Sequence, residues 1–140
     1  MGAGIAQVAL QAGLQVTLVD VAAAAVEKGT ERIRAGLGKL KEKGKLDDAR
    51  LTQALSSLRT GVKISELKDV DFAIEAVPEN EELKRKILKE LDAVVKPGGV
   101  LATNTSSISI TRLATATSRA EAVIGMHFMN PVSVSARVVW

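Results

Sequence analysis

The sequence contains a single histidine, His127, within the segment Met126–Pro131. Imidazole is the only side chain whose ordinary pKa lies near neutrality, so His127 is the candidate general base for a proton transfer. The residues 122–126 before it form an apolar run that is typical of a strand. A lone histidine is also common as a structural residue, and this one residue does not decide between the two interpretations.

A second candidate cluster, Asn104-Thr105-Ser106-Ser107, follows the apolar run Val100–Thr103. In a doubly wound parallel sheet, ligands bind beyond the carboxyl ends of the strands, so these hydroxyls and this amide would face the crevice. Glu79 and Asn80 follow another such run, Asp71–Val77, and would share the same rim. The alternative for the Ser/Thr cluster is an ordinary helix cap.

Glycines open the first helix, at Gly2-Ala3-Gly4, and a β-rich run ends in an acid at Asp20. In a dinucleotide-binding fingerprint, glycines let a helix N-terminus approach a pyrophosphate, and an acid about 20 residues on binds a ribose hydroxyl. The strand and the two earlier glycines of that fingerprint are absent from this sequence. The alternative is a small-residue helix followed by an unrelated strand.

A basic stripe lies on one helical face, within about 60° on a helical wheel. It consists of Lys28, Arg32, Lys39 and Lys43. A solvated helix face explains such a stripe, and a phosphate-bearing ligand is the alternative.

The elements that must position these residues are helices and strands that alternate along the sequence. Apolar periodicity predicts helices over residues 2–12, 21–43, 47–58, 79–95 and 110–117, and strands over 15–20, 61–64, 71–77, 100–103 and 122–126. Gly44 interrupts two of the helices and predicts a helical hairpin. The pattern favours an α/β fold, a Rossmann-like doubly wound parallel sheet with a helical hairpin insertion.

Composition excludes several classes of protein. The 140 residues are 46% hydrophobic and 25% charged, which suits one folded domain and not a disordered tail. No run is long enough to span a membrane, no secretory signal is evident, and the absence of cysteine suits a cytoplasmic protein. One histidine and no cysteine leave no metal site to expect. The net charge is +3, but only 2% of residues are aromatic, so we expect no nucleic-acid partner.

These clusters, in their order and spacing, resemble the N-terminal NAD-binding domain of the 3-hydroxyacyl-CoA dehydrogenases, especially the 3-hydroxybutyryl-CoA type. The resemblance extends from Met1 to about Val134. The matching stretches are Met1–Gln7, Leu18–Asp20, Glu27–Gly29, Glu31–Arg34, Ile74–Asn80, Asn104–Ser107 and Gly125–Val132.

The resemblance implies NAD-dependent oxidation of a (3S)-3-hydroxyacyl-CoA to the 3-oxoacyl-CoA, or the reverse, in fatty-acid or butyrate metabolism. It makes His127 the catalytic base and Ser106 the hydrogen-bond partner of the substrate's 3-oxygen. The cofactor contacts that it implies are Gly2 in the phosphate-binding loop, Asp20 on the adenosine ribose, Glu79 and Lys84 on the nicotinamide-ribose side, and Asn130. It also places the basic stripe in a helical hairpin that reaches toward the CoA phosphates.

Three departures from the family pattern lead us to expect a fragment. The opening strand is missing, Val139 stands where the family carries a glutamate twelve residues after the histidine, and the C-terminal helical domain is absent. The missing strand is the central one of a doubly wound sheet, so its loss would leave two half-sheets.

We therefore expect an N-terminally truncated NAD-binding domain over residues 1–134 and an atypical tail over 135–140, inactive alone. The parent enzyme is expected to dimerise through the missing domain. The alternative function is a non-catalytic nucleotide-binding or interaction module.

Overall fold

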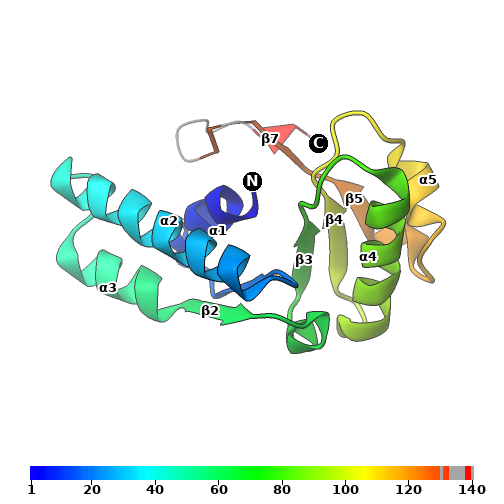
Figure 1. Ribbon diagram of the computed structural model, residues 1–140, viewed down its shortest axis with the longest axis horizontal. Coiled ribbons are helices and arrows are strands. Elements are labelled where there is room, and N and C mark those ends of the chain that lie inside the picture. The colour runs from blue at the N-terminus through cyan, green and yellow to red at the C-terminus, as the bar shows by residue number, and fades with distance from the viewer. Residues whose placement is uncertain (130, 133–137, 140) are drawn as a thin grey trace. The chain divides into compact units, whose positions relative to one another are not determined.

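The computed structural model describes residues 1–129, 131–132 and 138–139, which fall into two compact units (Figure 1). The N-terminal unit comprises Met1–Lys63 with the segment Asn130–Ala136, and the C-terminal unit comprises Ile64–Met129 with Arg137–Trp140. The expected site residues are divided between these units, so we describe each unit by itself.

The N-terminal unit consists of three helices and a pair of parallel strands. Its elements are α1 (Gly2–Gln11), β1 (Val16–Val19), α2 (Ala23–Glu42), α3 (Asp48–Ser56) and β2 (Leu58–Gly61). Their buried apolar side chains form one core, made of Ala6, Leu10, Ile33, Leu37, Leu46 and Ala54. The helical hairpin is confirmed: α2 and α3 are separated by a turn in which Gly44 has a φ of 68°.

The second strand of this unit does not lie where the sequence predicted it. We expected a helix to Leu58 and a strand over 61–64, but α3 ends at Ser56 and β2 begins at Leu58. Leu58 fits the apolar spacing of the preceding helix, yet it pairs with Val16 in the parallel ladder. Tertiary pairing with β1 therefore overrides the local helical pattern at this boundary.

The C-terminal unit is built on a three-stranded parallel sheet. Its elements are η1 (Ile64–Leu67), β3 (Phe72–Glu75), α4 (Glu81–Val94), β4 (Val100–Thr103), α5 (Ile110–Ala114), η2 (Ala120–Ala122), β5 (Val123–Gly125), β6 (His127–Phe128) and β7 (Val138–Val139). The strand order is β3-β4-β5, and α4 and α5 lie beside the sheet (Figure 1). Buried side chains of both layers form its core: Ala73, Leu88, Leu91, Val95, Leu101, Leu113, Ala114 and Val123.

Two short strands follow the predicted final strand. β6 and β7 pair in antiparallel fashion, with His127 opposite Val139 and Phe128 opposite Val138. The sequence did not predict either strand, because each has only two residues and no alternating pattern of its own. Part of the expected atypical tail is thus paired beside the candidate base, while residues 135–137 and 140 lie outside the described residues.

The expected division of the parallel strands into two half-sheets is confirmed. The described parallel strands form a pair, β1-β2, and a separate triplet, β3-β4-β5. None of the described helices is long and apolar enough to cross a membrane.

Candidate functional site

The carboxyl ends of β3 and β4 lie side by side in the C-terminal unit. Glu75 and Thr103 are paired in the parallel register, and the backbone N–H of Asn104 donates to the carbonyl of Glu75 at 2.9 Å. The loops 76–80 and 104–109 therefore leave the sheet at one edge, as the α/β pattern predicted.

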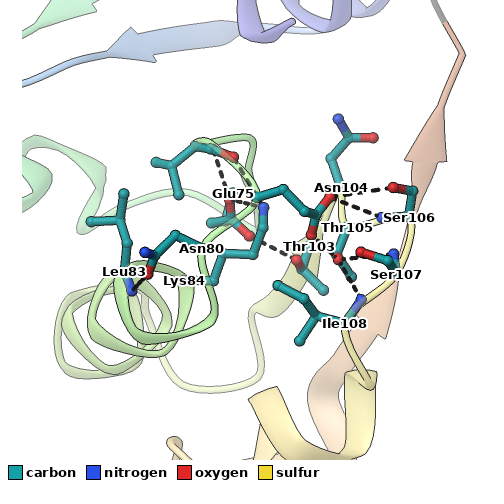
Figure 2. Close-up of polar contacts among 12 residues, drawn as sticks. Glu75, Asn80, Leu83, Lys84, Thr103, Asn104, Thr105, Ser106, Ser107 and Ile108 are labelled. Carbon is teal, nitrogen blue, oxygen red and sulfur yellow. Dashed lines mark hydrogen bonds and ion pairs between the residues drawn. The ribbon is translucent and has the colours of Figure 1, made fainter.

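A buried ion pair lies under these two loops. The Lys84 ammonium, which is 1% exposed, lies 2.8 Å from Oε1 of Glu75 and donates to the carbonyl of Val77 at 3.0 Å. The other Glu75 oxygen accepts from the Thr103 hydroxyl at 2.7 Å (Figure 2). Side chains from β3, α4 and β4 thus converge at one point. Lys84, expected beside the nicotinamide ribose, holds the loop from beneath in this structure.

The Glu79 carboxylate links the two loops at their exposed side. Oε1 accepts from the Thr105 hydroxyl, and Oε2 accepts from both the backbone N–H and the hydroxyl of Ser106 at 3.3 Å. The Thr105 hydrogen bond has the largest influence and lowers the pKa of Glu79 below its ordinary value of 4.5. Burial opposes this shift, but the hydrogen bonds from Ser106 and the charge of Lys84 reinforce it. Glu79 is therefore held as a carboxylate facing Ser106.

The Ser/Thr cluster shows the capping role that was considered from its sequence, and it leaves one serine exposed. The Thr105 hydroxyl oxygen accepts from the backbone N–H of Ile108 at 3.1 Å and of Ser107 at 3.4 Å, which is capping behaviour. Ser106 is exposed and directs its hydroxyl to Glu79. The cluster therefore has one residue that shapes the loop and another that is available to a ligand.

His127 lies in β6, immediately after the parallel sheet ends. The next residue, Phe128, donates its backbone N–H to the Asn104 side-chain Oδ1 at 2.7 Å. The His127 Nδ1 atom is buried and has no hydrogen-bond partner among the described residues. Its register partner is Val139, the position at which the resemblance led us to expect a glutamate. Asn130 lies outside the described residues.

The other two expected cofactor contacts lie in the N-terminal unit. Gly2 is the first residue of α1, and Asp20 is exposed directly after β1. One Asp20 oxygen accepts from the backbone N–H of Ala22 at 3.0 Å. This bond fixes the carboxylate in a turn at the carboxyl end of the strand, where a ribose-binding acid of a dinucleotide fold is expected.

A pocket of about 360 Å³ lies between α1 and α2 in the same unit. It is lined by Met1, Ala3, Gly4, Gln7, Arg32, Ala35, Gly36, Lys39, Pro131 and Val132. Arg32 and Lys39 belong to the basic stripe, so part of the stripe borders a cavity. The other two members, Lys28 and Lys43, do not line it.

Sequence reasoning missed Gln7 and Gly36, which shape this pocket. Gln7 is only 6% exposed, and a Cβ at position 36 would lie 2.1 Å from its Oε1 atom. The end of the Gln7 side chain therefore occupies space that a side chain at position 36 would enter. The available signal was a glutamine on the apolar face of the first helix, between Ala6 and Leu10.

Comparisons with known proteins identify similar sequences and structures. The family model described as "3-hydroxyacyl-CoA dehydrogenase, NAD binding domain" matches residues 1–138. A probable 3-hydroxybutyryl-CoA dehydrogenase of Deinococcus radiodurans is 48% identical over 132 residues, which are 94% of this chain and 47% of that protein. The fatty acid oxidation complex subunit alpha of Psychrobacter cryohalolentis is 41% identical over 95% of this chain and 18% of its own length.

Solved structures agree with these matches. The (S)-3-hydroxybutyryl-CoA dehydrogenase PaaH1 of Ralstonia eutropha superposes with a TM-score of 0.94 and 48% identity, covering 99% of this chain and 49% of that chain. The 3-hydroxybutyryl-CoA dehydrogenase of Escherichia coli K12 also gives a TM-score of 0.94, with 40% identity over 99% of this chain and 29% of that chain. The chain spans about half the length of the curated 3-hydroxybutyryl-CoA dehydrogenases that it matches.

Proposed function

The chain belongs to the family of 3-hydroxyacyl-CoA dehydrogenase NAD-binding domains, and we propose that it is the cofactor-binding part of such a dehydrogenase. The resemblance seen in the sequence is thereby confirmed, as is the Rossmann-like α/β class. The whole protein would convert a (3S)-3-hydroxyacyl-CoA to the 3-oxoacyl-CoA, or catalyse the reverse reaction. We also propose a cytoplasmic location, with which a cysteine-free sequence is compatible.

The observation that carries this proposal is the clustering at the ends of β3 and β4. Glu79 and Ser106 are joined by hydrogen bonds across the two loops, and Asn104 ties the same edge to the residue that follows His127. A serine, a carboxylate and the only histidine are thus held at one edge of the sheet, where a doubly wound fold binds its ligands.

These residues suit alcohol oxidation at C3 of the substrate. NAD, when bound, accepts the hydride. As the 3-hydroxyl becomes a carbonyl it must lose its proton, and His127 would take that proton, for a rate contribution of about 10²–10⁴-fold. Ser106 would donate its hydroxyl proton to the same oxygen in place of Glu79, while its backbone N–H would keep the bond to Glu79.

The proposed cofactor contacts are those that the family resemblance assigns, residue by residue. The first turn of α1, beginning at Gly2, would receive the pyrophosphate, and the Asp20 carboxylate would bind the adenosine ribose hydroxyls. Glu79 and Lys84 would serve the nicotinamide-ribose side, Lys84 by supporting the loop that carries Glu79, and Asn130 would be a further cofactor contact. A carboxylate at position 20 favours NAD over NADP, because it repels a 2′-phosphate.

The proposed substrate is an acyl-CoA. Arg32 and Lys39 border the 360 Å³ pocket, and neither has an ion-pair partner among the described residues. Two cations beside a cavity suit the phosphates of CoA. In the whole protein, we propose that residues 1–134 form the NAD-binding domain and that a C-terminal helical domain completes the acyl site and forms a homodimer.

One observation favours a second function, a nucleotide-binding module without turnover. The buried Nδ1 atom of His127 has no partner among the described residues, and the residue in register with it is Val139. A base whose imidazole is not oriented by a second group loses much of its effect. In the serine-protease triad, for example, the wrong imidazole tautomer lowers turnover by about 10⁴-fold.

The test combines NADH binding with turnover in the 140-residue chain. We expect NADH at a hundredfold excess over its dissociation constant to raise the unfolding free energy by about 2.7 kcal/mol. Asp20→Ala should reduce the stabilisation that NADH gives. It should also reduce the difference in stabilisation between NADH and NADPH. Absence of any thermal shift with millimolar NADH would overturn the proposal. NADH binding without acetoacetyl-CoA reduction is the result expected of the cofactor-binding part alone, whereas turnover that His127→Gln abolishes would exclude the non-catalytic module.

A further inference from the structure

The side chain of Asn104 continues the β4–β5 ladder beyond the point where the backbone of β4 can do so. The last regular bond of this ladder runs from the Met126 N–H to the carbonyl of Thr103 at 2.9 Å. In a parallel ladder, the next donor on this edge is two residues further on, at Phe128, and its acceptor would be the carbonyl of residue 105. At that point the chain has already left β4, whose last residue is Thr103.

The Asn104 side-chain oxygen takes the place of this missing carbonyl. Its Oδ1 atom accepts the Phe128 N–H at 2.7 Å, a short and well-formed hydrogen bond. The backbone of His127 is therefore held between two anchored amides, one bonded to Thr103 and the other to Asn104. On its opposite edge β6 pairs with β7.

Asn104 also belongs to the loop that carries Ser106. Its backbone N–H donates to the carbonyl of Glu75 at 2.9 Å, so this residue joins the ends of β3, β4 and β6. We expected its amide to face a ligand, but its acceptor is occupied by the Phe128 amide. The residue thus fixes the backbone beside His127 relative to the loop that presents Ser106.

We propose that Asn104 is a positioning residue for His127, a role that rests on the proposed function of His127 as the base. A hydrogen-bond acceptor at this position fixes the start of the β6 backbone. The position of the His127 imidazole depends on that backbone. Asparagine meets the requirement because it is long enough to reach the Phe128 amide and remains uncharged beside the histidine. Leucine has nearly the same shape without an acceptor, and aspartate retains the acceptor.

The test is NMR of the uniformly labelled 140-residue chain. His127 is the only histidine, so the imidazole resonances report one residue. We expect Asn104→Leu to speed hydrogen exchange at the Phe128 amide about tenfold, the size of one net hydrogen bond. We also expect it to broaden or split the His127 imidazole resonances. Asn104→Asp keeps the acceptor and should restore the protection of the Phe128 amide, and Ser107→Ala, in the same loop, should change neither feature.

These measurements need neither cofactor nor turnover, so they are independent of whether the chain binds NADH. Unchanged His127 resonances and unchanged Phe128 protection in Asn104→Leu would overturn the proposal. Equal loss of protection at the amides of Val100–Thr103 would also overturn it, because Asn104 would then support the whole sheet and not His127 in particular. Failure of Asn104→Asp to restore the protection of the Phe128 amide would exclude the side-chain acceptor as the cause.

Discussion

Replacing Lys84 by methionine is expected to cost about 3–5 kcal/mol of unfolding free energy, because it breaks a buried ion pair from one side. The Lys84 and Glu75 side chains are 1% and 0% exposed. After the substitution, the Glu75 carboxylate would keep its hydrogen bonds from Thr103 and from the Val77 N–H, but no positive charge would face it. Domains of ordinary stability have only about 5–15 kcal/mol in total, so the loss should be large.

The assay is urea unfolding followed by far-UV circular dichroism, with two further variants. Lys86→Met changes an exposed lysine on the same helix, and its effect should stay within about 0.5 kcal/mol. Adding Glu75→Gln to Lys84→Met removes the uncompensated charge and should recover about 1–3 kcal/mol of the loss. The reasoning is refuted if Lys84→Met behaves like Lys86→Met, or if the double variant is no more stable than Lys84→Met alone.

Three further predictions test other parts of the structure. Arg119→Lys should lower the unfolding free energy by about 1–3 kcal/mol, because a lysine cannot reproduce the hydrogen bonds from the guanidinium to the carbonyls at the end of α4. Urea unfolding measures this loss, and a loss under about 0.5 kcal/mol would contradict the prediction. The lowered pKa of Glu79 stabilises the fold above its ordinary pKa of 4.5, and this contribution is lost as the pH falls through the folded pKa. Glu79→Gln should therefore flatten the stability profile below pH 4.5, and an unchanged acid limb would argue against the assignment. Gly38→Ala, with open space around it, should stabilise the fold by up to about 1 kcal/mol, whereas Gly36→Ala should stabilise it less or destabilise it, because its Cβ would displace the end of the Gln7 side chain. Thermal melts in which the two variants shift equally would contradict this.

Local sequence patterns were sufficient to predict the type and position of most helices and strands. They failed where an element is very short or where its residues fit both patterns. The amphipathic α4 and the strand β4 lie where apolar periodicity predicted them, with ends shifted by a residue or two at α4. β2 was misplaced because Leu58 satisfies a helical pattern and a strand equally well. β6 was missed because two residues cannot show a period, and only its neighbours define it as a strand.

The candidate site was predicted as a set of residues, but not as a set of contacts. Parallel-strand logic placed Glu79 and Ser106 on one rim, and they are joined by hydrogen bonds there. The same logic could not foresee that Lys84 would be buried on Glu75, because a lysine on an amphipathic helix is exposed by default. Nor could it assign the Asn104 side chain to Phe128, 24 residues away along the chain.

By itself, the sequence determined the fold class, the family and the residue types available for chemistry, because periodicity, glycine placement and motif spacing are local properties of the chain. Only the tertiary structure decided which polar groups bond to one another. Glu75 and Lys84 form a buried pair because two strands and a helix meet there, and a buried charge must find an opposite one. Gly36 admits Gln7 because two helices approach closely at that point, and such an approach is a property of packing that local sequence does not encode.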